Sequence, residues 1–177
     1  SIANRMTEIN GVRHIPAVQG VLSKLAADLA MLEAMIMGQI QNCETMVPGY
    51  VNCNRRYMYA ALSWCQEGHT GIIDTVRELA GGNLLQMPAD ATVFEDPALR
   101  ERFENYFGTP FMDPIRRWKL MKIAWDLIGS EFAGRHQLYE KFYPGTTFVV
   151  RNQSFREAPW DYFHGRVNSL IDALETP

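Results

Sequence analysis

An apolar residue recurs every three or four positions between Val18 and Ile40, and this spacing constrains the fold more than any other feature of the chain. The series occupies one side of an α-helix and comprises Val18, Leu22, Leu25, Leu29, Leu32, Ile36 and Ile40. Asp28 and Glu33 interrupt the apolar run, so a membrane span is not expected. We predict a long amphipathic helix here, with Pro16 tolerated near its first turn and Pro48-Gly49 as its stop.

Helical spacing returns in three further segments, which we predict as helices over 55–79, 113–142 and 160–174. Gly81-Gly82 ends the first of these, because glycine accepts the left-handed conformation that a helix C-cap needs. Asp113-Pro114 begins the second, and Asp96-Pro97 begins a shorter helix that reaches Phe107.

Between these helices we expect a surface loop over 83–95, which holds Pro88, and a short extended piece over 146–150, where β-branched residues cluster. No repeat or linker-like run divides the chain. The prediction is therefore an all-α fold, a four-helix bundle of four main helices that forms one domain over 1–177.

Composition excludes several classes of protein. The 177 residues are 47% hydrophobic and carry a formal net charge of −3, which argues against disorder and against a nucleic-acid partner. Three cysteines in no C-x-x-C spacing disfavour a disulfide framework and fit a reduced, cytoplasmic compartment. The chain opens on Ser1; we expect no secretory leader, and we expect the chain to be a piece of a longer protein.

No residue pattern predicts a catalytic or metal site. None of the four histidines pairs in a Glu-x-x-His spacing, as a di-iron bundle requires, and no G-x-S-x-G elbow occurs. Gly129-Ser130 lies inside a helical pattern, so Ser130 is expected to be a hydroxyl on a helix face. Cys65 lies on an apolar stripe and is expected to be a small core residue.

Two features leave a binding role open. Gly81-Gly82 is either a simple helix end or a place where a ligand phosphate approaches the backbone. Arg135 follows Gly134 in a helix that is apolar on several faces, so it needs a carboxylate or a phosphate as partner. The excess of apolar helix surface favours an interface with another subunit or another domain.

Three blocks of sequence resemble the 4-hydroxyphenylacetate 3-hydroxylase oxygenase family over essentially the whole chain, as its C-terminal helical domain. They are Gly81 to Pro88 (GGNLLQMP), Phe94 to Pro97 (FEDP) and Lys122 to Glu140 (KIAWDLIGSEFAGRHQLYE). The resemblance implies a fold similar to that of acyl-CoA dehydrogenases, in which a C-terminal four-helix bundle builds a homotetramer or dimer.

The same resemblance implies an activity. Such an enzyme is a flavin-dependent monooxygenase that hydroxylates a phenol, such as 4-hydroxyphenylacetate, ortho to its hydroxyl with reduced FAD from a separate flavin reductase. Its catalytic residues would lie in the N-terminal and central domains of the same chain, outside this segment. Carried over by position, the cofactor-binding residues here would be Gly81, Gly82, Ser130, Phe132, Gly134 and Arg135.

Alternatives remain open. The segment could be a purely structural oligomerisation bundle, or it could belong to a chlorophenol monooxygenase, a siderophore-chromophore hydroxylase or a hydroxyacyl-CoA dehydratase. The dehydratase carries an iron–sulfur cluster held by three cysteines and a histidine, for which Cys43, Cys53, Cys65 and His69 are the candidates. The run from Gly134 to Glu140 resembles the hydroxylases instead.

Overall fold

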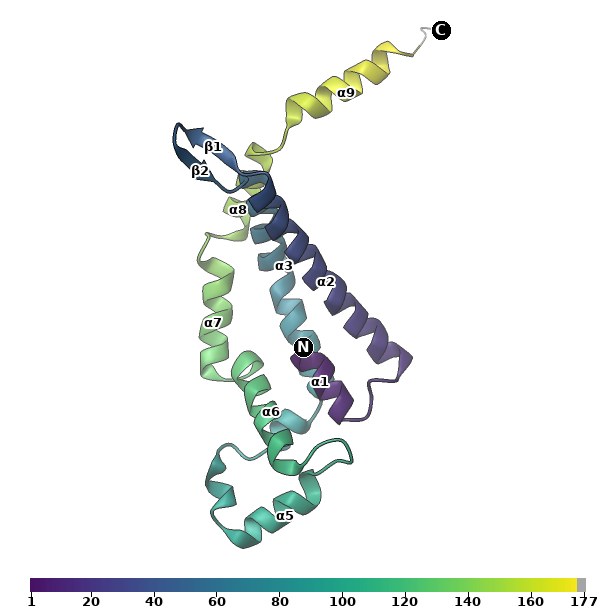
Figure 1. Cartoon of the computed structure of the whole chain (residues 1–177), viewed down its shortest axis with the longest axis vertical. Coiled ribbons are helices and arrows are strands. Elements are labelled where there is room, and N and C mark those ends of the chain that lie inside the picture. The colour runs from purple at the N-terminus through teal and green to yellow at the C-terminus, as the bar shows by residue number, and fades with distance from the viewer. Residues whose placement is uncertain (175–177) are drawn as a thin grey trace.

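A computed structural model describes residues 1–174, and helices dominate them (Figure 1). This confirms the predicted all-α fold. The elements in chain order are α1 (Ile2–Ile9), α2 (Pro16–Gln41), β1 (Glu44–Val47), β2 (Tyr50–Asn52), α3 (Arg55–Ala80), α4 (Asn83–Gln86), a 3-10 turn η1 (Ala91–Phe94), α5 (Pro97–Phe107), α6 (Pro114–Ile128), α7 (Glu131–Phe142), α8 (Thr147–Arg156) and α9 (Trp160–Asp172).

Helix α3 is the centre of the molecule, because α1, α2, α6, α7 and α8 all pack against it. It packs against α2 near the hairpin, and the two helices diverge toward the other end of the bundle (Figure 1). The core is formed mainly by α1, α3 and α6, where Met6, Ile9 and Met121 have no exposed surface. Each such side chain contributes about 1.5–3 kcal/mol of transfer free energy. The contact among these three helices is therefore a main source of the stability of the bundle.

The predicted helix starts are confirmed by their caps. Asp96 accepts hydrogen bonds from the backbone N–H groups of Ala98 and Leu99, and Asp113 accepts one from Arg116. Each aspartate precedes a proline at the first helical position, where the missing proline N–H costs nothing. These caps explain why the sequence located both starts correctly.

The prediction of one helix over 113–142 is wrong, because the chain breaks into α6 and α7 at Gly129-Ser130. Ser130 is the N-cap of α7, with its Oγ accepting from the N–H of Ala133 at 3.0 Å. At Gly129 an added Cβ would lie 2.6 Å from the Trp125 ring. Ser130 is therefore a helix cap and does not lie in mid-helix.

Three further expectations need correction. Of the expected extended piece over 146–150, only the N-cap Thr146 has extended angles; Thr147–Arg156 is helical, and Val150 is buried to 1% exposure against the bundle. Helix α2 ends at Gln41, well before the expected stop at Pro48-Gly49, which instead turns a β-hairpin that periodicity did not reveal, with Gly49 at φ 86°. The expected loop over 83–95 contains α4 and the 3-10 turn η1.

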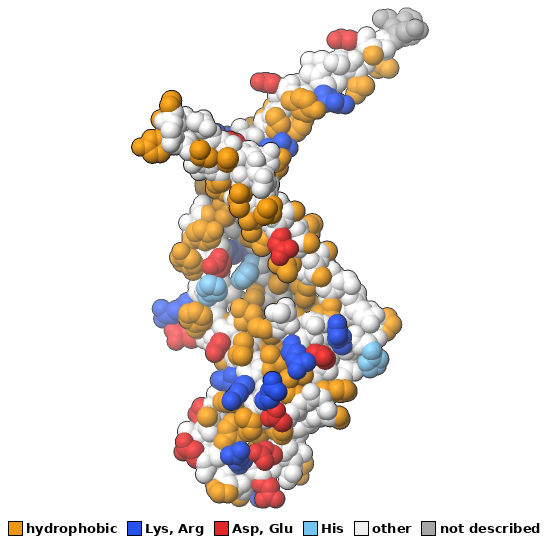
Figure 2. Space-filling model, in the orientation of Figure 1, with side chains coloured by type: hydrophobic (Ala, Val, Ile, Leu, Met, Phe, Trp, Pro, Cys, Tyr) orange, Lys and Arg blue, Asp and Glu red, His pale blue; other side chains and the backbone are white. Residues whose placement is uncertain are grey.

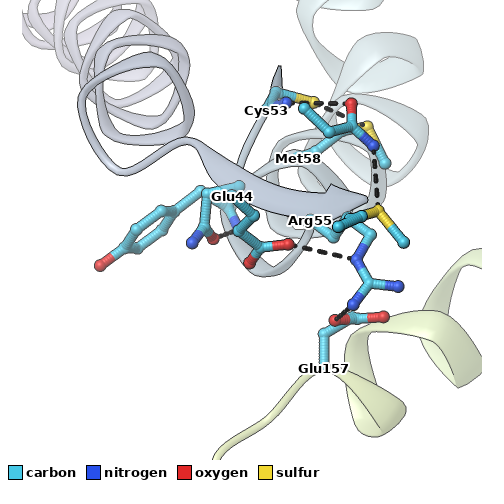
Figure 3. Close-up of polar contacts among 9 residues, drawn as sticks. Glu44, Cys53, Arg55, Met58 and Glu157 are labelled. Carbon is cyan, nitrogen blue, oxygen red and sulfur yellow. Dashed lines mark hydrogen bonds and ion pairs between the residues drawn. The ribbon is translucent and has the colours of Figure 1, made fainter. Parts of the chain in front are cut away.

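The hairpin is tied to the bundle by Arg55 at the start of α3 (Figure 3). Its Nε lies 3.3 Å from Glu44 of β1, and its Nη2 lies 3.2 Å from Glu157, which follows α8. A single guanidinium therefore joins the hairpin, α3 and the end of α8.

Gln66 of α3 fixes the turn between α7 and α8. Its Nε2 donates to the carbonyl oxygens of Lys141 and Gly145, both at 2.7 Å, and the residue is only 3% exposed. Its Oε1 is buried and has no hydrogen-bond partner among the residues described. The amide thus acts as a double donor between two backbone segments.

Helix α9 confirms the fourth predicted helix, but it extends away from the bundle instead of joining it (Figure 1). All of its residues are exposed, including Phe163 at 38% and Trp160 at 40%. The Trp160 Nε1 donates to the Phe155 carbonyl at 2.8 Å, and the two rings lie 5.1 Å apart. These contacts set the direction in which α9 leaves α8.

Candidate functional site

The Gly81-Gly82 turn lies where α3 ends and α4 begins. Gly81 has φ 57° and ψ −148°, a combination that only glycine adopts without strain. Its N–H donates to the carbonyl oxygens of Arg77 and Glu78, so the local prediction of a helix end is confirmed. Gly82 adopts ordinary helical angles and leads directly into α4.

A cavity of about 440 Å³ joins this turn to the break between α6 and α7. Gly81 and Gly129 both line it, so the packing of α3 against α6 brings two of the distinctive sequence blocks together. The lining comprises Arg77, Gly81, Leu84, Leu85, Met87, Ala89, Lys122, Trp125, Ile128 and Gly129.

The cavity is lined by two cationic side chains, Arg77 and Lys122, by the indole of Trp125 and by apolar side chains. No carboxylate of residues 1–174 lines it. The Arg77 Nε and Nη2 donate to the Ile128 carbonyl at 3.0 and 2.7 Å, and the Lys122 Nζ donates to Ala89 at 2.7 Å. Both cations are therefore held in place by backbone. Such a site suits a flat ring that carries an anionic group.

Sequence reasoning missed most of this lining. The one signal available for Arg77 is its position four residues before Gly81, which places it one helical turn below the glycine pair. Trp125 and Gly129 belong to the resembling block but were not singled out. Their proximity to Gly81 depends on the crossing of α3 and α6.

Arg117 is a buried cation that is hydrogen-bonded to Asn83, the residue that follows the glycine turn. It is 8% exposed and donates to the Phe107 carbonyl at 2.7 Å, to Asn10 Oδ1 at 3.1 Å and to Asn83 Oδ1 at 2.5 Å. Its guanidinium also lies over the Phe107 ring. Desolvation lowers the pKa of Arg117, because neutral oxygens compensate a buried charge less well than a carboxylate does.

The four candidate residues of the α7 block do not line this cavity. Ser130 caps α7, and Gly134 has open space where a Cβ would be. Phe132 is 69% exposed, and its ring stacks on His136. Arg135 has the carboxylate partner that was expected, Glu131 at 2.8 Å, but its side chain is 80% exposed and not surrounded by apolar residues.

Two larger cavities contain none of the predicted site residues. One of about 1000 Å³ lies against α1 and α2, and one of about 570 Å³ lies against α2 and α3. No group of three His, Cys, Asp or Glu side chains in residues 1–174 is placed to hold a metal ion. No helix in the same range is long and apolar enough to cross a membrane.

Comparison with known proteins points to one family. Residues 1–172 match the protein family defined by the C-terminal region of 4-hydroxyphenylacetate 3-hydroxylase. The oxygenase component of 4-hydroxyphenylacetate 3-monooxygenase from Klebsiella oxytoca is 26% identical over 97% of this chain, and the match covers 33% of that protein. The corresponding component from Escherichia coli is 40% identical over 50% of this chain and 17% of its own length.

Solved structures agree on the fold. The oxygenase component of 4-hydroxyphenylacetate 3-monooxygenase in complex with FAD and 4-hydroxyphenylacetate matches with a TM-score of 0.89 at 19% identity, over 97% of this chain and 36% of that one. An archaeal 4-hydroxybutyryl-CoA dehydratase matches with a TM-score of 0.85 at 14% identity, over 99% and 35%. The chain thus spans about a third of these relatives' length, and it belongs to the 4-hydroxyphenylacetate 3-hydroxylase family, whose C-terminal region it matches.

Proposed function

We propose that this chain is the C-terminal region of a two-component, flavin-dependent phenol hydroxylase that acts in the cytoplasm. In this role it lines part of a site for reduced FAD and assembles with copies of itself, while the upstream domains of the same protein hold the phenol. A separate reductase supplies the reduced flavin. The substrate class is that of the relatives, a phenol such as 4-hydroxyphenylacetate.

The observation that supports this most directly is the cavity lined by Gly81 and Gly129. Its two cations fit the pyrophosphate of FAD, and Trp125 and the leucines offer a surface for an aromatic ring. Gly81 exposes backbone on which no Cβ obstructs a ligand. When bound, reduced FAD supplies the oxygen chemistry, while residues of this chain bind, orient and shield it.

The residues carried over from the family extend the proposed contact beyond the cavity. Gly82 adjoins Gly81, and Ser130 adjoins Gly129. Phe132, Gly134 and Arg135 lie further along α7 on an exposed surface, where a flavin held by a neighbouring copy would reach them. Arg135 would then exchange its Glu131 partner for a phosphate.

The cavity is tested by titrating the full-length oxygenase with reduced FAD in the absence of oxygen. We expect Lys122→Met to weaken binding about tenfold, because one charge-assisted contact to phosphate is lost. The control is Lys119→Met on the same helix, since Lys119 is exposed and does not line the cavity. Equal affinity in both variants would remove the cavity from the site.

The α7 surface is tested separately by Arg135→Ala and Gly134→Ala. If the flavin approaches this surface, both variants weaken its binding, although neither side chain contributes to the core. Unchanged affinity in both removes α7 from the proposal. If Lys122→Met and the α7 variants all bind normally, the segment is the purely structural bundle, which the large exposed apolar surface of α2, α7 and α9 also fits.

A further inference from the structure

Two of the three cysteines flank the hairpin, Cys43 before β1 and Cys53 after β2. Glu44 at the start of β1 pairs with Asn52 at the end of β2, and the two strands are antiparallel. One step outward along this register Cys43 stands opposite Cys53, with both side chains on the same face of the hairpin. Two thiols that share no C-x-x-C spacing in the sequence are thus brought together by the strand pairing.

A second contact holds the two segments together beyond the cysteine pair. The backbone N–H of Asn54 donates to the carbonyl oxygen of Gln39 in α2 at 2.9 Å. Residues that lie opposite each other in an antiparallel pair have Cβ atoms roughly 4.5–5.5 Å apart, and a disulfide requires roughly 3.5–4.5 Å. A shift of about 1 Å therefore suffices to join the two sulfur atoms.

The surroundings of the two thiols differ. Cys43 is exposed, so a small oxidant reaches it directly from solvent. Cys53 is half-buried, and its Sγ lies 3.6 Å from the Sδ of Met58 in α3 (Figure 3). We therefore expect Cys43 to react first and Cys53 to be the resolving thiol.

The third cysteine, Cys65, is too far away to compete. It lies in α3, about 15 Å further along the helix axis than Arg55, because an α-helix rises about 1.5 Å per residue. Cα atoms that a disulfide joins lie at most about 7 Å apart. Cys43 and Cys53 are therefore the two cysteines that are placed to form a disulfide.

The hairpin itself would be stabilised by such a bond. It projects from the bundle, and apolar side chains stand out at its end (Figure 2), where Tyr50 is 74% exposed and Val51 is 70% exposed. A two-stranded hairpin is marginally stable in water on its own. A covalent bond at its base would fix the end of α2 to the start of α3.

We propose that Cys43 and Cys53 form a peroxide-sensitive pair, which closes to a disulfide at the base of the hairpin. The Cys43 thiolate attacks hydrogen peroxide, and the O–O bond breaks to give a sulfenic acid and hydroxide. The Cys53 sulfur then attacks the Cys43 sulfur, and the S–O bond breaks as the S–S bond forms. In total the two thiols lose two electrons and two protons, and one peroxide becomes two water molecules.

A reversible disulfide of this kind is compatible with a reducing compartment, where disulfides are transient and respond to oxidants. The inference goes beyond the proposed function and does not depend on flavin binding. A failed flavin titration would therefore leave it standing.

Peptide mapping of the full-length oxygenase tests the pair. The reduced protein is treated with hydrogen peroxide, its free thiols are blocked with iodoacetamide, and it is cleaved after Glu33, Glu44 and Arg55 with Glu-C protease and trypsin. This cleavage separates residues 34–44 from 45–55, so only a disulfide keeps Cys43 and Cys53 in one species. We expect a linked species that is lighter by two hydrogen atoms than the separate peptides and that dithiothreitol splits again.

The rate of linking distinguishes a built pair from random oxidation. We expect the link to form at least ~10-fold faster than Cys65 is oxidised, and at a rate that does not change with protein concentration. Cys65→Ser is the matched control and should link normally, whereas Cys43→Ser and Cys53→Ser should give no link. Gly49→Val should slow the linking about tenfold or more, because Gly49 at φ 86° sets the turn that aligns the strands.

Four results would each overturn the proposal. They are three cysteines that stay unlinked in peroxide, a sulfinic acid on Cys43 beside a free Cys53, a link that forms only between two molecules, and a rate that Gly49→Val leaves unchanged.

Discussion

Substitution of Gly129 tests whether this glycine is required by the packing around it or only by the turn between α6 and α7. An alanine Cβ there would lie 2.6 Å from two carbons of the Trp125 ring, a distance far inside van der Waals contact. The backbone angles of Gly129, φ −138° and ψ −19°, are open to other residues. The cost of Gly129→Ala is therefore steric, and overpacking of this kind costs about 1–3 kcal/mol.

Gly134→Ala is the matched control. Gly134 lies within α7, and an alanine Cβ there would meet nothing within 4 Å beyond its chain neighbours and the backbone of its own helix. The substitution should therefore stabilise the helix by about 0.5–1 kcal/mol. In a domain of this size each kcal/mol shifts Tm by about 2–4 °C. We expect Gly129→Ala to melt roughly 2–12 °C below the wild type, and Gly134→Ala a few degrees (~1–4 °C) above it.

Thermal unfolding followed by circular dichroism measures both variants. The Trp125 ring also lines the cavity, so its displacement should change the tryptophan fluorescence of Gly129→Ala and not of Gly134→Ala. If Gly129→Ala had the same Tm as the wild type, the Trp125 ring would be free to move aside, and Gly129 would be needed only for the turn.

Two other predictions concern single side chains. We expect Arg117→Met to lower the free energy of unfolding by about 2–4 kcal/mol in urea titrations, because three oxygens lose their donor; a loss below about 0.5 kcal/mol would contradict this role. Burial, and secondarily Glu140, raises the pKa of the Cys65 thiol. Iodoacetamide at pH 8 should therefore modify exposed Cys43 first, with Cys65 gaining reactivity above about pH 9 as its thiolate forms; equal rates at pH 8 would contradict the shift.

The sequence predicted helices well where a local signal exists. Asp96-Pro97 and Asp113-Pro114 carry their own caps, and Gly81 ends α3 within one residue of the predicted end. Prediction failed where tertiary packing determines the secondary structure. Thr146 to Val150 has the composition of a strand, but Thr147–Arg156 is helical, and Val150 is buried against the bundle.

The candidate site was predictable only in part, for the same reason. Gly81 was found because its conformation is a local property, whereas Gly129, Trp125 and Arg77 join it through the contact between α3 and α6. Arg135 was expected in apolar surroundings because its helix is apolar on several faces. Those faces point outward in this chain, and periodicity cannot distinguish a buried face from one that lacks a partner.

Deamidation of Gln66 would disrupt the contacts that its double-donor amide makes. Its two donor bonds go to the carbonyl oxygens of Lys141 and Gly145, and a deamidated side chain would present a carboxylate to both. Replacing the amide NH2 by a carboxylate oxygen would thus turn two hydrogen bonds into repulsion between oxygens at the α7–α8 turn. Since the residue is nearly sealed from water, the fold protects the group whose hydrolysis would open it.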